Sequence, residues 1–442
     1  MPRKILLITV GGAFVPVVTA IQQLQPDRVI FICSQRSASQ VNGDGSPCEE
    51  YRGGQVVNRL PNILEQTKTI DRFQADSDII LLEYEDDLEQ SYQAIRTAVE
   101  AVKLENGSAE IVANYTAGTK TMSVALGLVA LDYDMGLYLT KAQRLNLFNI
   151  KQGEVTERSS VGSVRAARRL KQIVPLFVAK YDYSPVITEL KQLLIDQEIQ
   201  PEQKVLIREQ LDFYRALEAW DCFDHAEAWR ELQHKMKDFR ELGLFLKRVL
   251  SSRLKIDTAF AQNAKQAGED YSVACHGYEL VEDLLLNAER RASQDRFDDA
   301  VGRLYRALEL LGQIRLLQAY KIETADVDLS ILPNDELRQQ YEHNKSGKVQ
   351  LSLRESYKLL CHLDPEDPLG QLYRKKERAI LDTLQIRNYS LFAHGFEPIT
   401  KALYQKVDNV FASFIRDGIS TVAFSKTSSK SNWQPIQFPT EV

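Results

Sequence analysis

The chain has 442 residues, which is too many for one compact core, so two or three domains are expected. Hydrophobic residues make up 44% and charged residues 26%, proportions that are typical of a soluble globular protein. The formal net charge of -6 excludes the broad basic field that holds long duplexes non-specifically, so we expect no stable DNA binding.

Cysteine usage indicates a reducing compartment. The five cysteines are scattered along the chain without a CxxC pair. This odd, unpatterned count argues against a disulfide framework and a zinc site, so a cytoplasmic protein without a metal is expected. Two glycines and a proline interrupt the apolar run from Ile5 to Ile21, which favours a strand, turn and helix over a targeting sequence. No later segment reaches ~18 uninterrupted apolar residues, so no membrane span is expected.

The first third of the chain alternates short apolar runs with helical patterns. Each run is apolar on both faces, as parallel strands covered by helices are. The predicted strands are 4–10, 28–33, 78–84 and 110–116, with helices at 87–104 and 120–131 and a terminal hairpin over 136–150. This βαβ rhythm predicts an α/β domain with an open, Rossmann-like, mainly parallel sheet.

The remainder of the chain has a helical pattern. After about residue 155, apolar residues recur at three- and four-residue spacing, which predicts an all-α half. One of its helices is expected over 374–394. We expect an α/β domain at 1–155, a helical connector at 156–262, a helical bundle at 263–425 and a polar C-terminal tail at 426–442.

Two glycine-containing turns follow predicted strands. They are "TVGGAFVP" at 9–16 and "NYTAGTKTMS" at 114–123. Ligands of open parallel sheets lie beyond the carboxyl ends of the strands, where both turns are expected. Gly118 permits a tight turn, and the helix start at Thr119 and Lys120 offers backbone N–H groups and a positive charge to a phosphate. Neither turn is a known nucleotide fingerprint, so a purely structural turn is the alternative.

A third notable stretch is "RNYSLFAH", from Arg387 to His394, followed by Gly395. A step of seven is about two helical turns, so both side chains are expected on one helix face, ~10 Å apart along the axis. With Gly395 as C-cap, the helix dipole would favour protonated His394. Histidine can move protons and a guanidinium can clamp a phosphate, which suits internal transesterification of RNA. The alternative is a capped helix end with a surface arginine and histidine.

These motifs resemble a known family. "RNYSLFAH" resembles the R-x4–6-H signature of HEPN ribonucleases, with the usual polar residue, Asn388, directly after the arginine. "LYRALELLGQIRLL" at 304–317 resembles the partner helix of such bundles. "LITVGGAFVP" and "NYTAGTKTMS" resemble the ligand turns of CARF domains. A CARF domain followed by a HEPN domain is the layout of the ancillary ribonucleases of type III CRISPR systems, and the resemblance covers nearly the whole chain.

The resemblance implies a homodimer that binds a cyclic oligoadenylate and then cuts single-stranded RNA without metal, as part of antiviral defence. Apart from this allosteric activator, for which a four-membered ring (cyclic tetra-adenylate) is expected, no cofactor is implied. Arg387 would stabilise the phosphate, His394 would handle protons and Asn388 would position either group. The activator-binding residues would be Thr9, Gly11, Gly12, Asn114, Thr116, Gly118, Thr119 and Lys120, with Ser34 and Gln35 as adenine contacts.

Two other functions are compatible with the same residues. A Rossmann-like enzyme acting on a mononucleotide could use the glycine turns, with the helices as a lid. It would need a carboxylate near the sheet edge, and Asp132 and Asp134 are the candidates, although they lie at the far end of a predicted helix. The chain could also be a non-catalytic nucleotide sensor whose helical half binds a partner.

Overall fold

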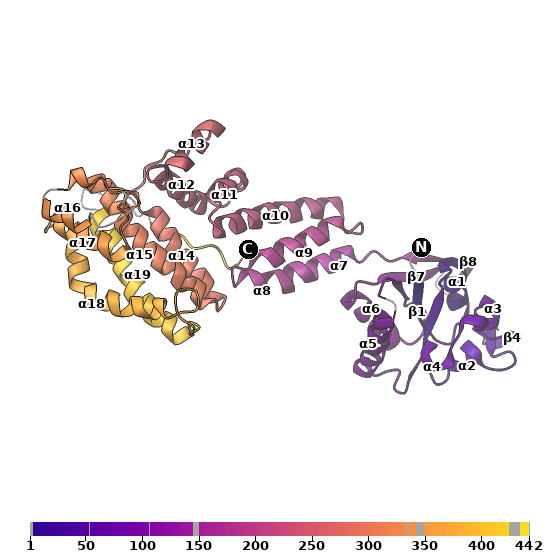
Figure 1. Cartoon of the computed structure of the whole chain (residues 1–442). Coiled ribbons are helices and arrows are strands. Elements are labelled where there is room, and N and C mark those ends of the chain that lie inside the picture. Colours follow the sequence, from indigo (N-terminus) through magenta and orange to yellow (C-terminus); the bar gives the residue numbers. More distant parts are fainter. Residues whose placement is uncertain are drawn as a thin grey trace. The chain divides into compact units, whose positions relative to one another are not determined.

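The chain folds into two compact units, Met1–Arg165 and Ala166–Val442, each of which is described by itself. In this computed structural model (Figure 1), the residues described are 3–52, 54–105, 107–144, 150–332, 335–341, 349–423 and 434–441.

The first unit is built on a six-stranded sheet in the order β5-β2-β1-β6-β7-β8. Neighbouring strands run parallel except β8, which is antiparallel to β7. The predicted open, mainly parallel sheet is therefore confirmed. The strands of this sheet are β1 (Lys4–Val10), β2 (Arg28–Ser34), β5 (Ile79–Leu82), β6 (Glu110–Asn114), β7 (Gly136–Arg144) and β8 (Ile150–Arg158).

Helices cover both faces of this sheet (Figure 1). Along β1, Ile5 and Leu7 pack into a core with α5 and α6, whereas Leu6 and Ile8 pack into a second core with α1 and α3. Burial on both faces is the reason why β1 is apolar at consecutive positions. The helices of the unit are α1 (Val15–Leu24), α2 (Ala38–Asn42), α3 (Ile63–Thr67), α4 (Ala75–Asp78), α5 (Leu88–Glu105) and α6 (Lys120–Asp132), with a 3₁₀ turn at Ile70–Arg72.

Two hairpins differ from the sequence prediction. The terminal hairpin exists, but it pairs β7 with β8 and extends to Arg158 instead of ending at 150, and residues 145–149 lie outside the described ranges. A second hairpin, β3 (Cys48–Arg52) with β4 (Gln55–Leu60), was not predicted. Five of the six residues of β4 are exposed, so the strand lacks the apolar alternation by which a half-buried strand is detected.

The described part of the second unit is helical, as predicted. One hydrophobic core is built mainly by the helices up to α13, and another by α14 to α19. The helices are α7 (Gly162–Arg168, which begins in the first unit), α8 (Val174–Val178), α9 (Tyr183–Ile195), α10 (Pro201–Asp221), α11 (His225–Leu232), α12 (Arg240–Leu254), α13 (Thr258–Ala267), α14 (Glu279–Ser293), α15 (Phe297–Tyr320), α16 (Asp335–Tyr341), α17 (Leu353–Leu363), α18 (Pro368–Asn388) and α19 (Lys401–Ala423), with a π-helical turn at Arg169–Ile173 and 3₁₀ turns at Gln233–Lys235 and Leu329–Ile331.

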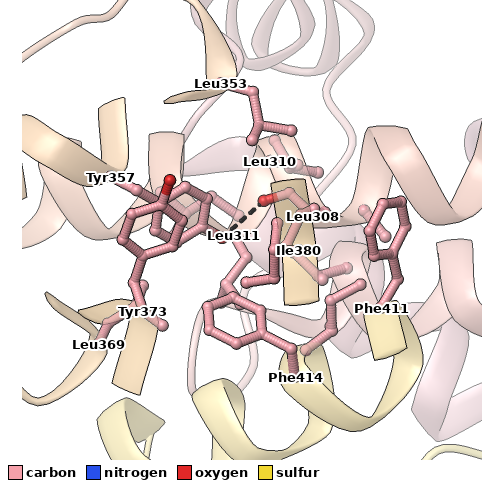
Figure 2. Packing of buried hydrophobic residues seen from close by; sticks show 14 of the residues in the cluster. Leu308, Leu310, Leu311, Leu353, Tyr357, Leu369, Tyr373, Ile380, Phe411 and Phe414 are labelled. Carbon is pink, nitrogen blue, oxygen red and sulfur yellow. Dashed lines mark hydrogen bonds between the residues drawn. The ribbon is translucent and has the colours of Figure 1, made fainter. Parts of the chain in front are cut away.

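An aromatic cluster fixes α15, α17, α18 and α19 against one another (Figure 2). Tyr357 of α17 stacks on Tyr373 of α18 with ring centroids 4.8 Å apart, and Phe414 of α19 meets both rings edge-on. The Tyr357 hydroxyl donates a hydrogen bond of 2.7 Å to the carbonyl of Leu308 in α15. Because the tyrosine ring lies against Gly312, a larger residue in α15 would separate the two helices. This packing positions the helices that carry the RNYSLFAH motif and its predicted partner.

A buried charged junction connects the two cores of the second unit. Asp283 of α14 accepts a hydrogen bond of 3.0 Å from the indole of Trp220 and lies 2.9 Å from Nε2 of His225. Asp221, at the end of α10, accepts a hydrogen bond of 2.6 Å from Arg290 of α14. All five side chains are buried. Each carboxylate thus has polar partners, which is the condition under which charged groups are tolerated in a core.

The C-terminal segment packs on this junction. The sequence predicts a polar tail over 426–442, but Phe438 is only 2% exposed in the described part, 434–441. Its ring lies 3.8 Å from the Arg290 guanidinium and 4.9 Å from Trp220. Gln437 accepts a hydrogen bond of 2.8 Å from Arg290. Single apolar residues in a polar segment give no periodic signal, so this anchor could not be recognised from the sequence.

Candidate functional site

The two glycine turns meet at the carboxyl edge of the sheet in the first unit. A Cβ on Gly11 would lie 2.5 Å from the backbone nitrogen of Gly118, so the turns are in direct backbone contact. Gly118 has a φ of 85°, and a Cβ there would crowd Thr9 and Met122. Thr9 donates a hydrogen bond of 2.5 Å to the carbonyl of Ala117. The turns expected at one edge of the sheet thus form one surface, and only glycine fits at the contact.

A buried set of hydrogen bonds holds the second turn. The Asn114 amide donates to the Thr140 hydroxyl at 3.1 Å and accepts from the backbone N–H of Thr116 at 3.1 Å. The Thr116 hydroxyl accepts a hydrogen bond of 2.7 Å from the backbone N–H of Thr140. Asn114 is fully buried, so its side chain shapes the turn from beneath. Direct ligand contact by Asn114 and Thr116 stays a prediction.

The helix start at Lys120 is organised by Thr119. The Thr119 hydroxyl accepts a hydrogen bond of 3.2 Å from Met122 and donates one of 2.9 Å to the carbonyl of Glu85. Lys120 is exposed at the first position of α6. The first N–H groups of a helix have no intrahelical acceptors, and its dipole favours an anion there. The arrangement therefore suits a phosphate beside Lys120.

Glu85 is a part of this edge that sequence reasoning missed. It follows β5, and its carbonyl meets Thr119 although the two residues are 34 positions apart. The signal that could have revealed it is topological, because every parallel strand of the sheet ends at the same edge.

The remaining predicted contacts lie in the turns after β1 and β2. Gly12 is exposed, with open space where a side chain would be. The buried hydroxyl of Ser34 lies 3.2 Å from that of Ser37, so it closes its own turn, whereas Gln35 is exposed. Their adenine contacts stay predictions.

The RNYSLFAH motif is not helical to its end, and this part of the prediction was wrong. α18 ends at Asn388, and its C-cap is Tyr389 instead of Gly395. Ser390 closes the helix, since its hydroxyl donates a hydrogen bond of 2.7 Å to the Arg387 carbonyl. The argument that placed His394 in the last helical turn, two turns from Arg387, therefore does not apply.

Residues 389–397 instead form a compact turn, which we call the 389–397 loop. Ser390 and Glu397 form an isolated β-bridge across it. The backbone N–H of His394 donates a hydrogen bond of 3.2 Å to the carbonyl of Asn388, which returns His394 to the end of α18. A Cβ on Gly395 would overlap the carbonyl of Tyr389, so the loop requires glycine here. Its hydrogen bonds keep His394 near the helix terminus.

Arg387 lies where α18 meets α15. Its guanidinium carbon is 4.3 Å from the ring centroid of Tyr305 in α15, and its Nη1 donates a hydrogen bond of 3.2 Å to the Asn388 side chain. Burial raises the pKa of the Tyr305 phenol. Arg387 is half-buried, whereas Asn388 and His394 are exposed. The site thus combines a guanidinium on an aromatic face, an amide and an accessible imidazole, which can bind a phosphate and exchange protons with it.

The described ranges contain no group of three or more His, Cys, Asp or Glu residues that could hold a metal ion. None of the helices in these ranges is long and apolar enough to cross a bilayer.

Comparisons with known proteins agree with this architecture. Residues 272–417, which include Arg387 and His394, match the family model of the Csm6 HEPN domain. The chain is similar to the structure of Enterococcus italicus Csm6 bound to cyclic hexa-2'-fluoro-hexa-dAMP, with 13% identity, a TM-score of 0.52, and coverage of 97% of this chain and 96% of that one. At this identity the likeness concerns the fold.

A second solved structure, protein VC1899 from Vibrio cholerae, has 12% identity and a TM-score of 0.24 over 43% of this chain and 50% of that one. That score is too low to support an argument. A comparison with curated protein sequences found no match.

Proposed function

We propose that the chain is a CARF–HEPN ancillary ribonuclease of type III CRISPR systems, and that it cuts single-stranded RNA, without metal, when a cyclic oligoadenylate is bound. The observation that carries this proposal is that Arg387 and Asn388 lie at the contact of α18 with α15, and that the backbone of His394 is bonded to the same end of α18, inside the segment that matches the Csm6 HEPN domain.

The proposed reaction is internal transesterification of RNA. The 2′-hydroxyl attacks the adjacent phosphorus and loses its proton, the bond from phosphorus to the 5′-oxygen breaks, and the leaving oxygen gains a proton. His394 would exchange these protons, and Arg387 would stabilise the charge on the phosphate oxygens. The products are a 2′,3′-cyclic phosphate and a 5′-hydroxyl. Tyr305 restricts Arg387 before the substrate arrives, which lowers the ordering cost of binding.

We propose a homodimer as the active form. One chain supplies a single accessible imidazole in this motif, whereas a twofold axis between two HEPN domains would bring two arginine–histidine sets to one phosphodiester. The same symmetry would place two copies of the Gly118 turn around one ring of repeated nucleotides. Each turn would offer a helix start and Lys120 to the ring's phosphates.

A cyclic oligoadenylate is the proposed activator, and its ring size needs a direct test. The family resemblance favours a four-membered ring, whereas the Enterococcus italicus structure contains a six-membered analogue. The alternative of a mononucleotide enzyme gains no support, since Asp132 accepts a hydrogen bond of 2.6 Å from Tyr92 at the opposite end of α6 from Lys120.

One experiment tests the proposal. A fluorogenic single-stranded RNA is incubated with the protein and EDTA, alone or with cyclic tetra-adenylate or cyclic hexa-adenylate. We expect cleavage only with one of the rings. Cleavage that needs a divalent metal, or no cleavage with any ring, would contradict it, and binding of a ring without cleavage would instead favour a non-catalytic sensor.

A further inference from the structure

The 389–397 loop exposes an unusual amount of aromatic surface. Tyr389 is 69% exposed, Phe392 76% and Phe396 87%, although such side chains usually lie inside a folded protein. All three lie within two residues of Asn388 or His394 along the chain. Exposed aromatic side chains this close along the chain to charged and polar groups, here called the aromatic patch, are typical of a binding surface.

The backbone of the loop prevents these rings from turning into the core. The N–H of Leu391 donates to the carbonyl of Glu397 at 3.0 Å, and the N–H of Gly395 donates to the carbonyl of Ser390 at 3.1 Å. The contact of Gly395 with the Tyr389 carbonyl closes the loop further. The rings are therefore presented outward by a restrained backbone, which lowers the cost of ordering them on a ligand.

The chemistry of the loop favours nucleobases. The 389–397 loop has one acidic residue, Glu397, at its end, and none occurs between Arg387 and Phe396, where the three aromatic side chains lie. A strand whose phosphate lies at Arg387 and His394 must place the bases on either side of that phosphate near the loop. Unpaired bases stack on aromatic faces whatever their sequence, which is how single-stranded nucleic acids are commonly held.

We propose that Tyr389, Phe392 and Phe396 form a stacking platform for the bases next to the scissile phosphate of single-stranded RNA. This inference rests on the proposed function, because it uses the same site. The platform holds the strand in register, so these residues position the substrate and take no part in proton transfer. The competing occupant of the patch is the partner copy in the dimer.

The decisive measurement is binding of a non-cleavable RNA analogue, in which every 2′-hydroxyl is replaced by fluorine, by fluorescence anisotropy in the presence of activator. This measurement does not require catalysis, so it tests the stacking platform even if the protein fails to cleave RNA. The variants are Phe392→Leu and Phe396→Leu, which keep apolar bulk but lose the ring, and Phe392→Trp and Phe396→Trp, which keep a ring. Leu391→Ala is the matched control, since Leu391 is an aliphatic residue of the same loop and is 58% exposed.

We expect each leucine variant to weaken RNA binding about five- to 150-fold, as loss of one stacked base does, and each tryptophan variant to bind like the wild type. Leu391→Ala should bind RNA like the wild type. For cleavage, the leucine variants should raise KM more than they lower kcat. Dimer dissociation, measured by analytical ultracentrifugation, should be unchanged in all of them.

Two results would overturn the inference. One is RNA affinity that is unchanged in both leucine variants. The other is weaker dimerisation in Leu391→Ala and in the leucine variants, together with normal RNA affinity at protein concentrations where the dimer is intact. That combination would show that the aromatic patch contacts the partner copy instead of RNA. A fluorogenic RNA that the wild type fails to cut would instead refute the proposed function and leave the anisotropy result interpretable.

Discussion

Gly395→Ala is expected to abolish the proposed RNA cleavage while leaving the fold nearly unchanged. The added methyl would overlap the carbonyl of Tyr389, where real contacts require well over 3 Å, so the 389–397 loop must open by about 1 Å or more. His394, the preceding residue, moves with it. A misplacement of this size in a catalytic group can cost about 100-fold in rate. Crowding of this kind costs about 1–3 kcal/mol in stability, which a loop can partly relieve by moving.

The chain offers a matched control for this substitution. Gly302 is exposed on α15, and a Cβ there would meet nothing within 4 Å. Gly302→Ala should therefore keep full activity and gain about 0.5–1 kcal/mol, because alanine is favoured over glycine within a helix. The assay is cleavage of a fluorogenic RNA at saturating activator, with thermal unfolding in parallel. If Gly395→Ala cleaves at a rate close to that of the wild type, the loop does not position His394 for catalysis.

Four further predictions concern separate parts of the molecule. His394→Ala should abolish cleavage without altering the melting temperature or the dimer, and an active variant would remove this residue from the site. Lys120→Ala should weaken activator binding, measured by calorimetry, by about 1.5–3 kcal/mol per lost charge-assisted contact. Maximal cleavage should be regained at saturating activator, and unchanged binding would place the ligand elsewhere. A heterodimer of wild type with His394→Ala should be strongly impaired if the site is composite, whereas half activity per dimer would indicate two independent sites. Phe438→Ala should lower the free energy of unfolding by about 3–5 kcal/mol in denaturant titrations, whereas Gln434→Ala, at an exposed position of the same segment, should leave it unchanged. If Phe438→Ala were as stable as Gln434→Ala, the C-terminal segment would not be anchored.

The sequence was sufficient to predict the sheet and the edge at which the two glycine turns meet, because each depends on local patterns. Apolar runs predicted β1, β2, β5 and β6, and glycines after β1 and β6 marked the turns that now meet at Gly11 and Gly118. It could not reveal the partners that support those turns. Thr140 and Glu85 reach the site only because β7 is next to β6 and because the loop after β5 meets the start of α6.

The error in the RNYSLFAH motif has a physical cause. The apolar spacing of Leu391 and Ala393 continues the helical pattern past Asn388, so periodicity alone extends the helix. What ends α18 is a hydrogen bond from the Ser390 hydroxyl and a backbone contact at Gly395, neither of which has a periodic signature. The pairing of Arg387 with Tyr305 was likewise invisible, because it depends on how α15 packs on α18.

On the proposed function, activation would pass through the connector helices of the second unit, and buried hydrogen bonds join these to α14 in the segment that matches the HEPN domain. A ligand in the first unit can promote cleavage only to the extent that it binds the active arrangement more tightly than the idle one. Asp283 of α14 is held by Trp220 of α10 and by His225 at the start of α11, all of them buried. If α10 moved alone, a buried carboxylate would lose its partners, which is costly, so α14 should move with it. Because α14 packs on α15, and α15 carries Tyr305 beneath Arg387, a displacement of the connector reaches the guanidinium that would clamp the phosphate.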